Sequence, residues 1–545
     1  MTQTAQAPHY DAVVIGAGIT GIYQAYCLKK AGFNVRGIEA GGDVGGTWYW
    51  NRYPGCRLDT ESYAYGYFEL KNIVPEWKWS ERFASQPELL RYVQHAADKM
   101  DVKRLYAFNT RVVSAHFLED GNIWRITLDT GEVLTCQFLL SAVGPLSASR
   151  LPDIPGIDSF QGEAFHSSRW PHGEDGGPRS TDFSGKRVGV IGTGATGVQI
   201  IPIVAKTAQS LHVFQRTPNW CTPLGNHALT PELLETLRGK KDQFLEFLKS
   251  TETAFPYERH PKKASQASVE ERQALFESLY EMPGYGIWLS GYRDLLTSKT
   301  SNQYLGDFIA SKIRERVKDP AVAEKLIPKN HAFGTRRVPM ETNYYEVYNQ
   351  ENVELVDLNE TPIERITPTG IEVAGRHIEL DVIVYATGFN AVTGSFDQID
   401  IRGRGQQTLK EAWAEGPATY LGLQSAGFPN FFTLVGAHNG AAFCNIGVCG
   451  ALQVEWVTRM IEYMRDKDYS VAETLPEHQE QWTAYVYEMY SKTLLRDSDA
   501  WWVKTTHHPD GSVTRRALIF VGHAAEYRAL CERVAEQEYE GFALQ

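Results

Sequence analysis

Cysteine is scarce in this 545-residue sequence, and long apolar runs are missing. The seven cysteines form an odd, scattered set, as expected of a chain in a reducing cytoplasm, and no metal-ligand spacing stands out. No apolar run approaches the ~20 residues that a membrane-spanning helix needs. Residues 1–10 are polar and run directly into an apolar strand, which leaves no room for a signal peptide. We therefore expect a cytoplasmic protein that binds neither a metal nor a membrane.

Positive charge is also in deficit, with 54 lysines and arginines against 66 aspartates and glutamates and a formal net charge of −12. A chain of net negative charge is repelled by nucleic acid, so we do not expect nucleic acid as a partner. The chain is too long for a single hydrophobic core, and its length predicts two or three domains.

Glycine, in contrast, is plentiful, and two Gly-x-Gly-x-x-Gly loops stand out, each directly after an apolar strand. The glycines are Gly16, Gly18 and Gly21 in the first loop and Gly192, Gly194 and Gly197 in the second. This spacing lets a strand turn sharply into a helix whose N-terminal amides bind a pyrophosphate. Two such loops predict two dinucleotides, and hence electron transfer between cofactors within one protein.

The residues that follow each loop distinguish the two sites. Glu39 and Gln215 stand the same number of positions after the third glycine of their loops. An acid at this place accepts hydrogen bonds from ribose hydroxyls and repels a 2′-phosphate, whereas Arg216 beside Gln215 can bind one. We interpret the first site as FAD-binding and the second as NADPH-binding. The alternative is two NAD-type sites, one of them degenerate.

The two sites are predicted to be interleaved along the chain. We expect an α/β fold with two Rossmann-like dinucleotide-binding domains, for FAD and NADPH, and a helical insertion. Thr230 and Pro231 offer a cap and a first-turn proline for this insertion, which is either a lid or a set of helices that only pack. The predicted parts are 1–145 and 381–545 for the FAD-binding domain, 146–222 and 326–380 for the NADP-binding domain, and 223–325 for the helical insertion.

Two longer stretches carry a resemblance to a known family. Residues 160–171 match the pattern F-x-G-x-x-x-H-x-x-x-W-P at every fixed position, and residues 45–59 match a second pattern that ends in an aspartate. The fixed positions of the first stretch are Phe160, Gly162, His166, Trp170 and Pro171. On these motifs the sequence resembles the type I Baeyer–Villiger monooxygenases, flavoproteins that insert one oxygen of O2 next to a ketone carbonyl. The resemblance extends from residue 10 to the tryptophans near residue 501.

The resemblance implies an NADPH-dependent flavin monooxygenase. NADPH would reduce FAD, O2 would form a C4a-peroxyflavin, and a ketone, expected to be cyclic, would become a lactone or an ester. NADP would stay bound during oxygen insertion and shield the site from water. The expected partners are the ketone and O2, and a homo-oligomer remains open.

The catalytic roles implied by the resemblance fall on Arg337 and Asp59. A fixed cation over the flavin stabilises both the peroxide and the adduct with the carbonyl, and Asp59 would orient it. Arg336 would join Arg216 and Thr217 at the 2′-phosphate of NADPH, although the family often has lysine at the position of Arg336. Without the resemblance, paired arginines would more often be a solvated surface pair.

Other residues are assigned by the same resemblance. Gly46, Thr47 and Trp48 would contact the cofactor, as would Trp501, although the neighbouring Trp502 leaves that register open. Phe443 and Cys444 are expected in the wall of the substrate pocket. For His166 we favour a role in coupling the movement of the NADP-binding domain to the flavin site over direct acid–base catalysis.

Three alternatives remain. A flavin disulfide reductase has the same two-dinucleotide plan, but Trp48 occupies the place of its first redox cysteine, and Cys444 and Cys449 are interpreted as buried structural thiols. A related flavoenzyme that oxygenates nitrogen or sulfur would differ at the Trp–Pro end of residues 160–171. A nucleotide sensor without turnover would not need an arginine–aspartate pair at the flavin.

A CoA-linked ketone would need basic groups to bind its phosphates. Arg259, Lys262 and Lys263 in the insertion could supply them. A solvated basic turn is the more ordinary interpretation of the same residues.

Overall fold

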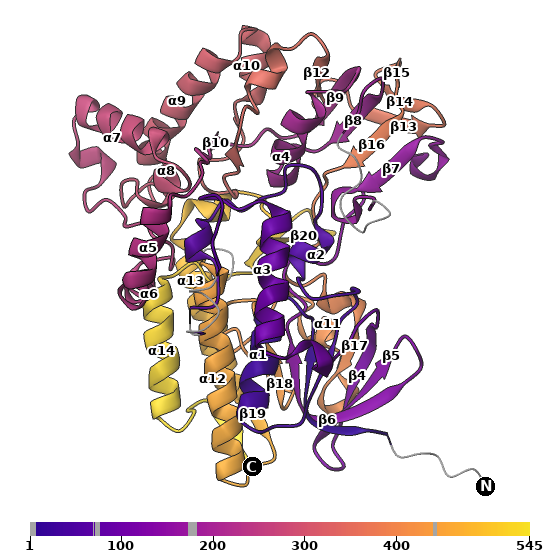
Figure 1. The fold of residues 1–545 in the computed structure, drawn as a ribbon, viewed down its shortest axis with the longest axis vertical. Helices are drawn as coiled ribbons and strands as arrows, with labels where there is room; N and C mark the ends of the chain where they lie inside the picture. The colour runs from indigo at the N-terminus through magenta and orange to yellow at the C-terminus, as the bar shows by residue number, and fades with distance from the viewer. Residues whose placement is uncertain (1–6, 69, 71–76, 173–181, 440–443) are drawn as a thin grey trace.

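The computed structural model describes residues 7–68, 70, 77–172, 182–439 and 444–545. Two large sheets lie within these ranges, in the lower and upper parts of Figure 1, and each is built around one glycine loop. A cluster of helices covers one side of the upper part. The two sheets confirm the predicted α/β fold with two Rossmann-like units.

The first sheet has eight strands in the order β17-β4-β5-β6-β1-β2-β3, with β18 also pairing to β6. β1 pairs in parallel with β2 and β6, and its residues Ala12–Ile15 are buried on both faces, as is usual at the centre of a parallel sheet. The strands are β1 (His9–Ile15), β2 (Val35–Ile38), β3 (Tyr106–Ala107), β4 (Val112–Leu118), β5 (Ile123–Leu128), β6 (Val133–Ser141), β17 (Asp400–Arg402) and β18 (Phe431–Thr433).

The second sheet has five strands, all parallel, in the order β12-β9-β8-β16-β7. A smaller antiparallel sheet, β13-β14-β15, accompanies it in the chain. The strands are β7 (Glu163–His166), β8 (Arg187–Ile191), β9 (Ser210–Gln215), β12 (Val353–Asp357), β13 (Ile363–Thr367), β14 (Gly370–Val373), β15 (Arg376–Glu379) and β16 (Val382–Tyr385).

The domain boundary predicted at residue 381 is wrong. β16 follows that boundary but lies inside the second sheet, between β8 and β7, with Val382 opposite both Val188 and Glu163. The chain rejoins the first sheet only at β17. An apolar strand carries no local signal for which of two parallel sheets it joins, so the sequence predicted the strand but assigned it to the wrong domain.

The segment between 223 and 325 is helical, as predicted, and runs along the left side of Figure 1 from mid-height, at α5 and α6, to the top, at α10. Its first helix begins at Pro231, and the Thr230 hydroxyl accepts a hydrogen bond from the Leu233 amide at 3.3 Å, which is the expected cap. The helices are α5 (Pro231–Gly239), α6 (Lys241–Ser250), α7 (Val269–Glu281), α8 (Gly286–Leu289), α9 (Lys299–Arg316) and α10 (Pro320–Leu326); the short strands β10 (Thr222–Pro223) and β11 (Met340–Glu341) pair at its base.

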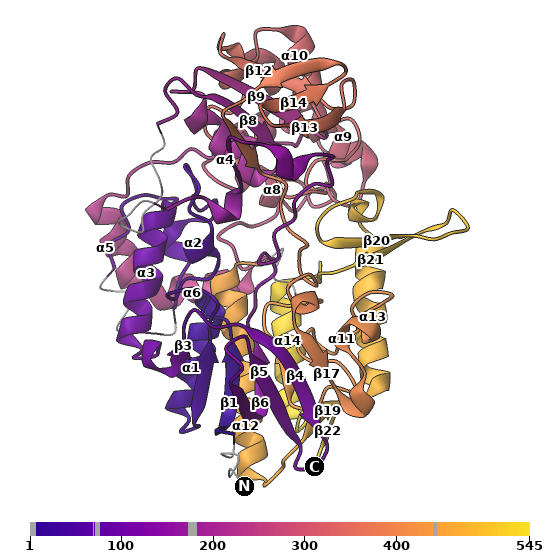
Figure 2. The same cartoon turned by 90° about the vertical axis from the view of Figure 1, so that its right-hand side faces the viewer.

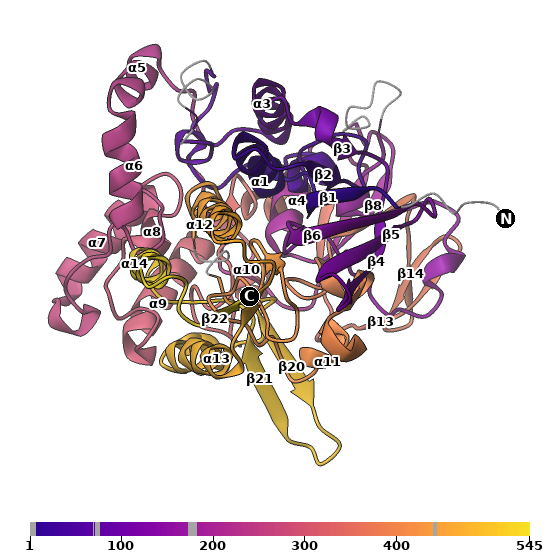
Figure 3. The ribbon, with the colours of Figure 1, turned by 90° about the horizontal axis from the view of Figure 1, so that it is seen from below.

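The helix that follows the first glycine loop packs against the longest helix of the C-terminal part. α1 and α12 lie side by side in Figures 1 and 3, and the Gln24 amide donates to the Thr458 hydroxyl at 2.9 Å between them. The hairpin β20–β21 projects from the body of the molecule (Figure 2). The remaining elements are α1 (Ile19–Lys30), α2 (Thr47–Trp50), α3 (Gln86–Lys99), α4 (Ala195–Val204), α11 (Leu409–Ala412), α12 (Ile446–Asp466), α13 (Pro476–Ser491), α14 (Ala524–Glu536), β19 (Ala472–Thr474), β20 (Val503–His507), β21 (Val513–Ala517) and β22 (Phe542–Leu544). A search of the described helices finds none with the length and apolarity required to cross a bilayer.

Candidate active site

A cavity of about 560 Å³ connects the two dinucleotide-binding units. Its wall combines the first glycine loop, the first turn of α4 after the second loop, and part of the helical insertion. The predicted site residues among those lining it are Gly16, Gly18, Glu39, Gly46, Thr47, Trp48, Asp59, Arg337, Cys444 and Trp501. The fold therefore brings together residues that lie hundreds of positions apart.

The first glycine loop has the geometry of a pyrophosphate cradle. Gly16 has φ +103°, and a Cβ there would collide with the carbonyl oxygen of Ala142. A Cβ at Gly21 would collide with the carbonyl oxygen of Gly16, whereas one at Gly18 would meet only the Cα of Gly46, at 3.7 Å. Gly18 is also the N-cap of α1 and supplies no side-chain cap, so the first amides of the helix remain available to an anion. These residues fit FAD.

The second loop repeats this geometry. Gly192 has φ +108°, and a Cβ there would collide with the carbonyl oxygen of Ala386. A Cβ at Gly197 would collide with the carbonyl oxygen of Gly192, whereas nothing lies within 4 Å of a Cβ at Gly194. Because α4 also has no side-chain cap, its N-terminus fits a second dinucleotide.

Glu39 is held by the backbone of the loops beside it. Its carboxylate accepts from the amides of Ala17 at 2.7 Å and Gly41 at 2.6 Å, one on each oxygen. Burial raises the pKa of Glu39, while the two amide hydrogen bonds act in the opposite direction. The carboxylate therefore has a fixed orientation at the cavity wall, as an acceptor for ribose hydroxyls requires.

The stretch 45–59 packs directly on the first loop. Gly46 has φ +52°, and a Cβ there would approach the Cα of Gly18 to 2.7 Å. The indole N–H of Trp48 donates to the Tyr65 hydroxyl at 3.0 Å. Together with Thr47, these residues place the start of α2 against the position expected for the flavin nucleotide.

Arg337 and Asp59 form an ion pair at the cavity. The Arg337 Nη2 donates to both oxygens of Asp59, at 2.7 and 2.9 Å, and to the hydroxyl of Tyr285 at 3.1 Å. The Asp59 carboxylate raises the pKa of Arg337, so the guanidinium is a permanent cation. Within the described part of the chain, Nε and Nη1 of Arg337 make no hydrogen bond, which leaves them available to a group in the cavity.

Arg216 and Arg336 lie close to one another near the second loop. Burial lowers the pKa of Arg336; the charge of Asp499 opposes this shift, and the charge of Arg216 adds to it. Among the described residues neither arginine forms an ion pair, and the Nε of Arg336 is buried without a hydrogen bond. The backbone oxygen of Thr217 accepts from the Thr193 hydroxyl at 3.1 Å and so connects this region to the loop. Two neighbouring guanidinium groups that are not engaged in an ion pair with a described residue fit a phosphate dianion.

Trp501 lines the cavity, whereas Trp502 is buried in the core with 1% exposure. The structure thus resolves the register that the sequence left open, in favour of Trp501. Contact with the nicotinamide remains a prediction.

The stretch 160–171 contacts β16 and the residues directly after it. His166 is buried; its Nε2 lies 3.0 Å from the carbonyl oxygen of Gly388, and its Nδ1 accepts from the Ser168 amide at 3.2 Å. Burial lowers the pKa of His166. Since both ring nitrogens are engaged within the protein, the geometry supports a positioning role rather than proton transfer.

The other fixed positions of this stretch also have structural reasons. A Cβ at Gly162 would approach the Asp381 carbonyl oxygen to 2.6 Å. Trp170 is buried, and its ring packs edge-on against Phe165 with centroids 4.7 Å apart. Phe160 packs against the core that includes β16, and Pro171 follows Trp170. The stretch therefore links the second sheet to the cavity wall.

Two expectations for the substrate pocket need comment. Cys444 lines the cavity, but it is joined to Cys449 in a disulfide, so the prediction of two separate thiols is wrong. The spacing was visible in the sequence, but the turn into α12 that brings the two sulfurs together was not. Phe443 lies outside the described residues.

Two of the three basic residues considered for CoA binding are already paired within the insertion. Arg259 forms an ion pair with Glu252 at 2.8 Å, and Lys262 lies 3.6 Å from Glu271. Neither lines the cavity. The solvated-turn interpretation therefore suits Arg259 and Lys262 better.

The sequence left open whether the insertion forms a lid, and it identified none of the insertion residues that line the cavity. Phe255, Tyr285, Trp288 and Leu289 all line the cavity. The available signal was the aromatic cluster from 285 to 288 inside an otherwise charged, helical segment. Only the fold shows that this cluster faces Arg337.

Comparison with known proteins agrees with this geometry. A family described as flavin-binding monooxygenase-like matches residues 10–228. The chain is 64% identical, over the full length of both, to the 2-oxo-Δ3-4,5,5-trimethylcyclopentenylacetyl-CoA monooxygenase of Pseudomonas putida, and 40% identical to a Baeyer–Villiger monooxygenase of Pseudooceanicola batsensis, over 90% of this chain and 89% of that protein. The crystal structure of OTEMO in complex with FAD and NADP superimposes with a TM-score of 0.96 at 63% identity, covering 99% of this chain and 100% of that one.

Proposed function

Because the chain belongs to the Baeyer–Villiger monooxygenases, we propose that its cavity accepts a cyclic ketone carried on coenzyme A and that Arg337 is the cation of oxygen insertion. The protein is an NADPH-dependent flavin monooxygenase that uses O2 to convert a ketone into a lactone or an ester. The observation that carries the proposal is the Arg337–Asp59 pair, which faces a cavity shared by both dinucleotide loops.

FAD, reduced by NADPH, supplies the activation of O2 and NADPH supplies the hydride. The protein's own contribution to the chemistry is electrostatic. Addition to a ketone moves negative charge onto the former carbonyl oxygen, and the free Nε and Nη1 of Arg337 are donors of fixed direction for that charge. Asp59 keeps the guanidinium charged and in place. No general base is needed from His166.

The two dinucleotide sites would bind different cofactors. Glu39, with Gly46, Thr47 and Trp48, would hold FAD in the first unit. Arg216, Thr217 and Arg336 would hold the 2′-phosphate of NADPH in the second, with Trp501 against its nicotinamide. We assign residues 1–145 and the C-terminal part from β17 onward to the FAD-binding domain. We assign residues 146–222, and the part from residue 326 to the end of β16, to the NADP-binding domain.

The CoA-linked substrate rests on the 64% identical relative, whose name contains a CoA ester of a cyclopentenylacetic acid. A thioester is neutral where the free acid carries a carboxylate. Taking that charge out of water costs free energy unless a partner neutralises it, and Arg337 is already paired with Asp59. We therefore expect the ester to be used in preference to the acid.

The test compares a CoA-linked cyclopentenyl ketone, its free acid and a neutral cyclic ketone, by product formed per NADPH oxidised. The expected result is tightly coupled lactone from the ester, and a KM for the free acid at least about tenfold higher. Lactone from the neutral ketone but none from the ester would refute the CoA-linked substrate and leave the ketone reaction standing. Absence of lactone from all three would refute cyclic ketones of this class as substrates, whereas the role of Arg337 is tested separately by Arg337→Ala.

A further inference from the structure

Arg337 has a partner besides Asp59. Both oxygens of Asp59 accept from a single nitrogen, Nη2, and the Tyr285 hydroxyl accepts from that same nitrogen at 3.1 Å. A guanidinium held end-on by one carboxylate can still swing about the bonded nitrogen. A second acceptor, from a different element, fixes the plane of the group and hence the directions of Nε and Nη1.

Tyr285 is itself tightly held. It is 3% exposed, and its ring packs edge-on against Phe255 and Trp288 with centroid distances of 5.7 and 5.4 Å. Burial raises the pKa of Tyr285, and Asp59, which is within hydrogen-bonding reach of the hydroxyl, raises it further, so the hydroxyl keeps its proton and contacts both members of the pair. Its backbone amide donates to the Tyr257 hydroxyl at 3.0 Å. Both the ring and the backbone of Tyr285 are therefore fixed.

The anchor of Tyr257 is a buried acid of the FAD-binding unit. The Tyr257 hydroxyl donates to Glu61, which is fully buried and also accepts from Arg82 Nη2 at 3.1 Å. Gly284 makes this approach possible, because it has φ +82° and a Cβ there would lie 2.5 Å from the Tyr257 hydroxyl oxygen. Hydrogen bonds thus run from the first unit, through the insertion, to the catalytic pair.

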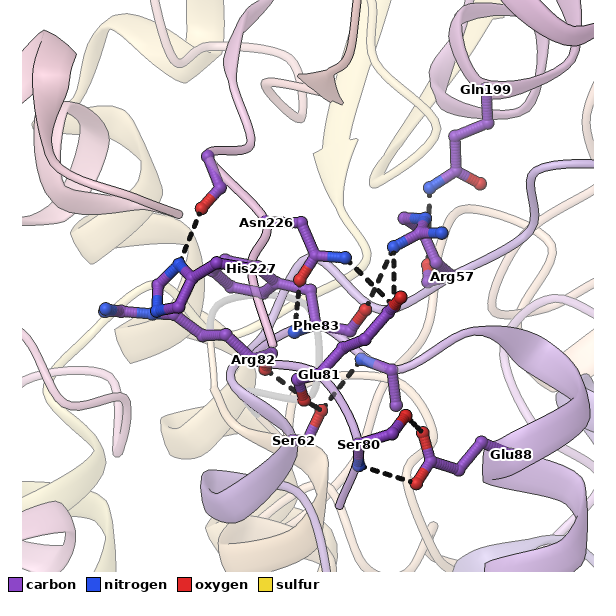
Figure 4. Close-up of polar contacts among 12 residues, drawn as sticks. Arg57, Ser62, Ser80, Glu81, Arg82, Phe83, Glu88, Gln199, Asn226 and His227 are labelled. Carbon is purple, nitrogen blue, oxygen red and sulfur yellow. Dashed lines mark hydrogen bonds and ion pairs between the residues drawn. The ribbon is translucent and has the colours of Figure 1, made fainter. Parts of the chain in front are cut away.

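The chain around Arg82 is joined to the base of the insertion (Figure 4). Glu81 accepts from Arg57 Nη1 at 3.1 Å and from the Asn226 side chain at 3.0 Å. The Arg82 amide donates to the His227 carbonyl oxygen at 2.9 Å. The insertion is therefore held on the FAD-binding unit at both ends of this network, at Asn226–His227 and at Tyr257.

We propose that Tyr285 is a positioning residue for oxygen insertion: its hydroxyl fixes the guanidinium of Arg337, and the Glu61–Tyr257 pair fixes Tyr285. The proposal depends on the role of Arg337 proposed above. It gives the insertion a part in catalysis besides forming the cavity wall. The substrate need not touch Tyr285 for the effect to operate, because Tyr285 acts through Arg337.

The test is Tyr285→Phe in the enzyme loaded with FAD. Removing a hydrogen bond to a charged group should raise the fraction of NADPH that ends as hydrogen peroxide about tenfold. Anaerobic flavin reduction by NADPH should change by less than about twofold, since hydride transfer does not use the direction of the guanidinium. A crystal structure of the variant should show Arg337 in a second orientation with the Asp59 contact altered.

The matched control is Tyr292→Phe. Tyr292 lies in the same insertion, is 2% exposed and packs its ring against Phe276, but its hydroxyl bonds to nothing in the described part of the chain, and it does not line the cavity. This variant should remain as coupled as the wild type, which would exclude a general effect of losing a buried hydroxyl.

Two outcomes would overturn the proposal. In the first, the Tyr285→Phe enzyme forms as much product per NADPH as the wild type and Arg337 keeps its orientation. In the second, the variant slows flavin reduction as much as it lowers the product formed per NADPH. The parallel variant Arg337→Ala distinguishes a failure of the role proposed for Tyr285 from a failure of the role proposed for Arg337. If it abolishes product while Tyr285→Phe stays coupled, only the role of Tyr285 fails. If Arg337→Ala still forms product at the normal rate, the role of Arg337 fails first.

Discussion

The first and second glycine loops share one backbone geometry. Gly16 and Gly192 have φ values of +103° and +108°, and each turns against the carbonyl oxygen of an alanine, Ala142 in the first unit and Ala386 in the second. Each loop leads into a helix that has no side-chain cap. The backbone of each loop therefore fits a pyrophosphate, but it does not distinguish one dinucleotide from another.

Their surroundings differ. The first loop is covered by Gly46, and its acid, Glu39, is buried and held by two amides. At the second loop nothing lies within 4 Å of a Cβ on Gly194, and the nearby Arg216 is exposed. From this difference we expect the first cofactor to be enclosed and retained, and the second to bind at a more open site, as a substrate that must exchange requires.

The largest expected effect is at Arg337, where the two sites meet. Arg337→Ala should lower lactone formation by a factor of order 100 to 1,000, the usual cost of losing one preorganised donor. Flavin reduction by NADPH should remain measurable, because transfer between the two loops does not require this cation. The measurement is product and hydrogen peroxide formed per NADPH, alongside anaerobic reduction of the flavin.

Asp59→Ala is the graded companion to that variant. The arginine remains but loses its anchor, so the same defect should appear in a milder form. Lactone formation by Arg337→Ala at a near wild-type rate would show that the cation of oxygen insertion lies elsewhere.

A smaller effect, on NADPH binding, is expected when a side chain fills the open space beside Gly194 in the second loop. Gly194 has φ −78°, so alanine is tolerated there, but its methyl group would project into the open space where we expect the pyrophosphate. Gly194→Ala should leave the thermal unfolding midpoint unchanged and raise the KM for NADPH at least about tenfold.

The control within the same loop is Gly192→Ala, which should destabilise the protein because of the positive φ and the collision with Ala386. If Gly194→Ala unfolds the protein, or binds NADPH normally, the second loop is not the open site described above.

The smallest effect concerns a buried histidine in the C-terminal part of the FAD-binding unit. His438 is fully buried; its Nε2 lies 3.1 Å from the Ala517 carbonyl oxygen, and burial lowers the pKa of His438 to about 4. Between about pH 6.5 and 4 the unfolded chain takes up the proton and the folded chain does not, so stability falls as the pH falls.

For this one group, the loss of stability between pH 7 and 5 amounts to about 2 kcal/mol. His438→Gln should reduce the loss by that amount, measured as the urea dependence of flavin release at the two pH values. An unchanged difference would show that His438 is not neutral in the folded protein.

The sequence predicted the residues of the glycine loops and of the family motifs better than it predicted which distant segments pack around them. The glycine loops, Glu39 and the Arg337–Asp59 pair depend on local patterns or family motifs, and the structure places them at one cavity. The strand from Val382 to Tyr385 was predicted, but its sheet was not, since burial on both faces is equally compatible with either sheet.

Other features depend on contacts between distant segments. Trp501 and Trp502 are chemically equivalent in the sequence, and only the turn before β20 decides which faces the cavity. The hydroxyl of Tyr285 meets Arg337 across a sequence separation of 52 residues. No periodicity or propensity encodes such a meeting, because it depends on how the insertion folds back onto the first unit.

The contrast between the two loops is tested most directly by cofactor preference in Arg216→Ala. We predict that wild-type enzyme with one retained FAD prefers NADPH to NADH, and that the variant raises the KM for NADPH while leaving that for NADH nearly unchanged. Removing a guanidinium paired with a phosphate costs roughly 2–4 kcal/mol, which is about 30-fold at the lower end, and NADH never makes that contact. Equal losses with both cofactors would contradict the assignment of the second loop to NADPH.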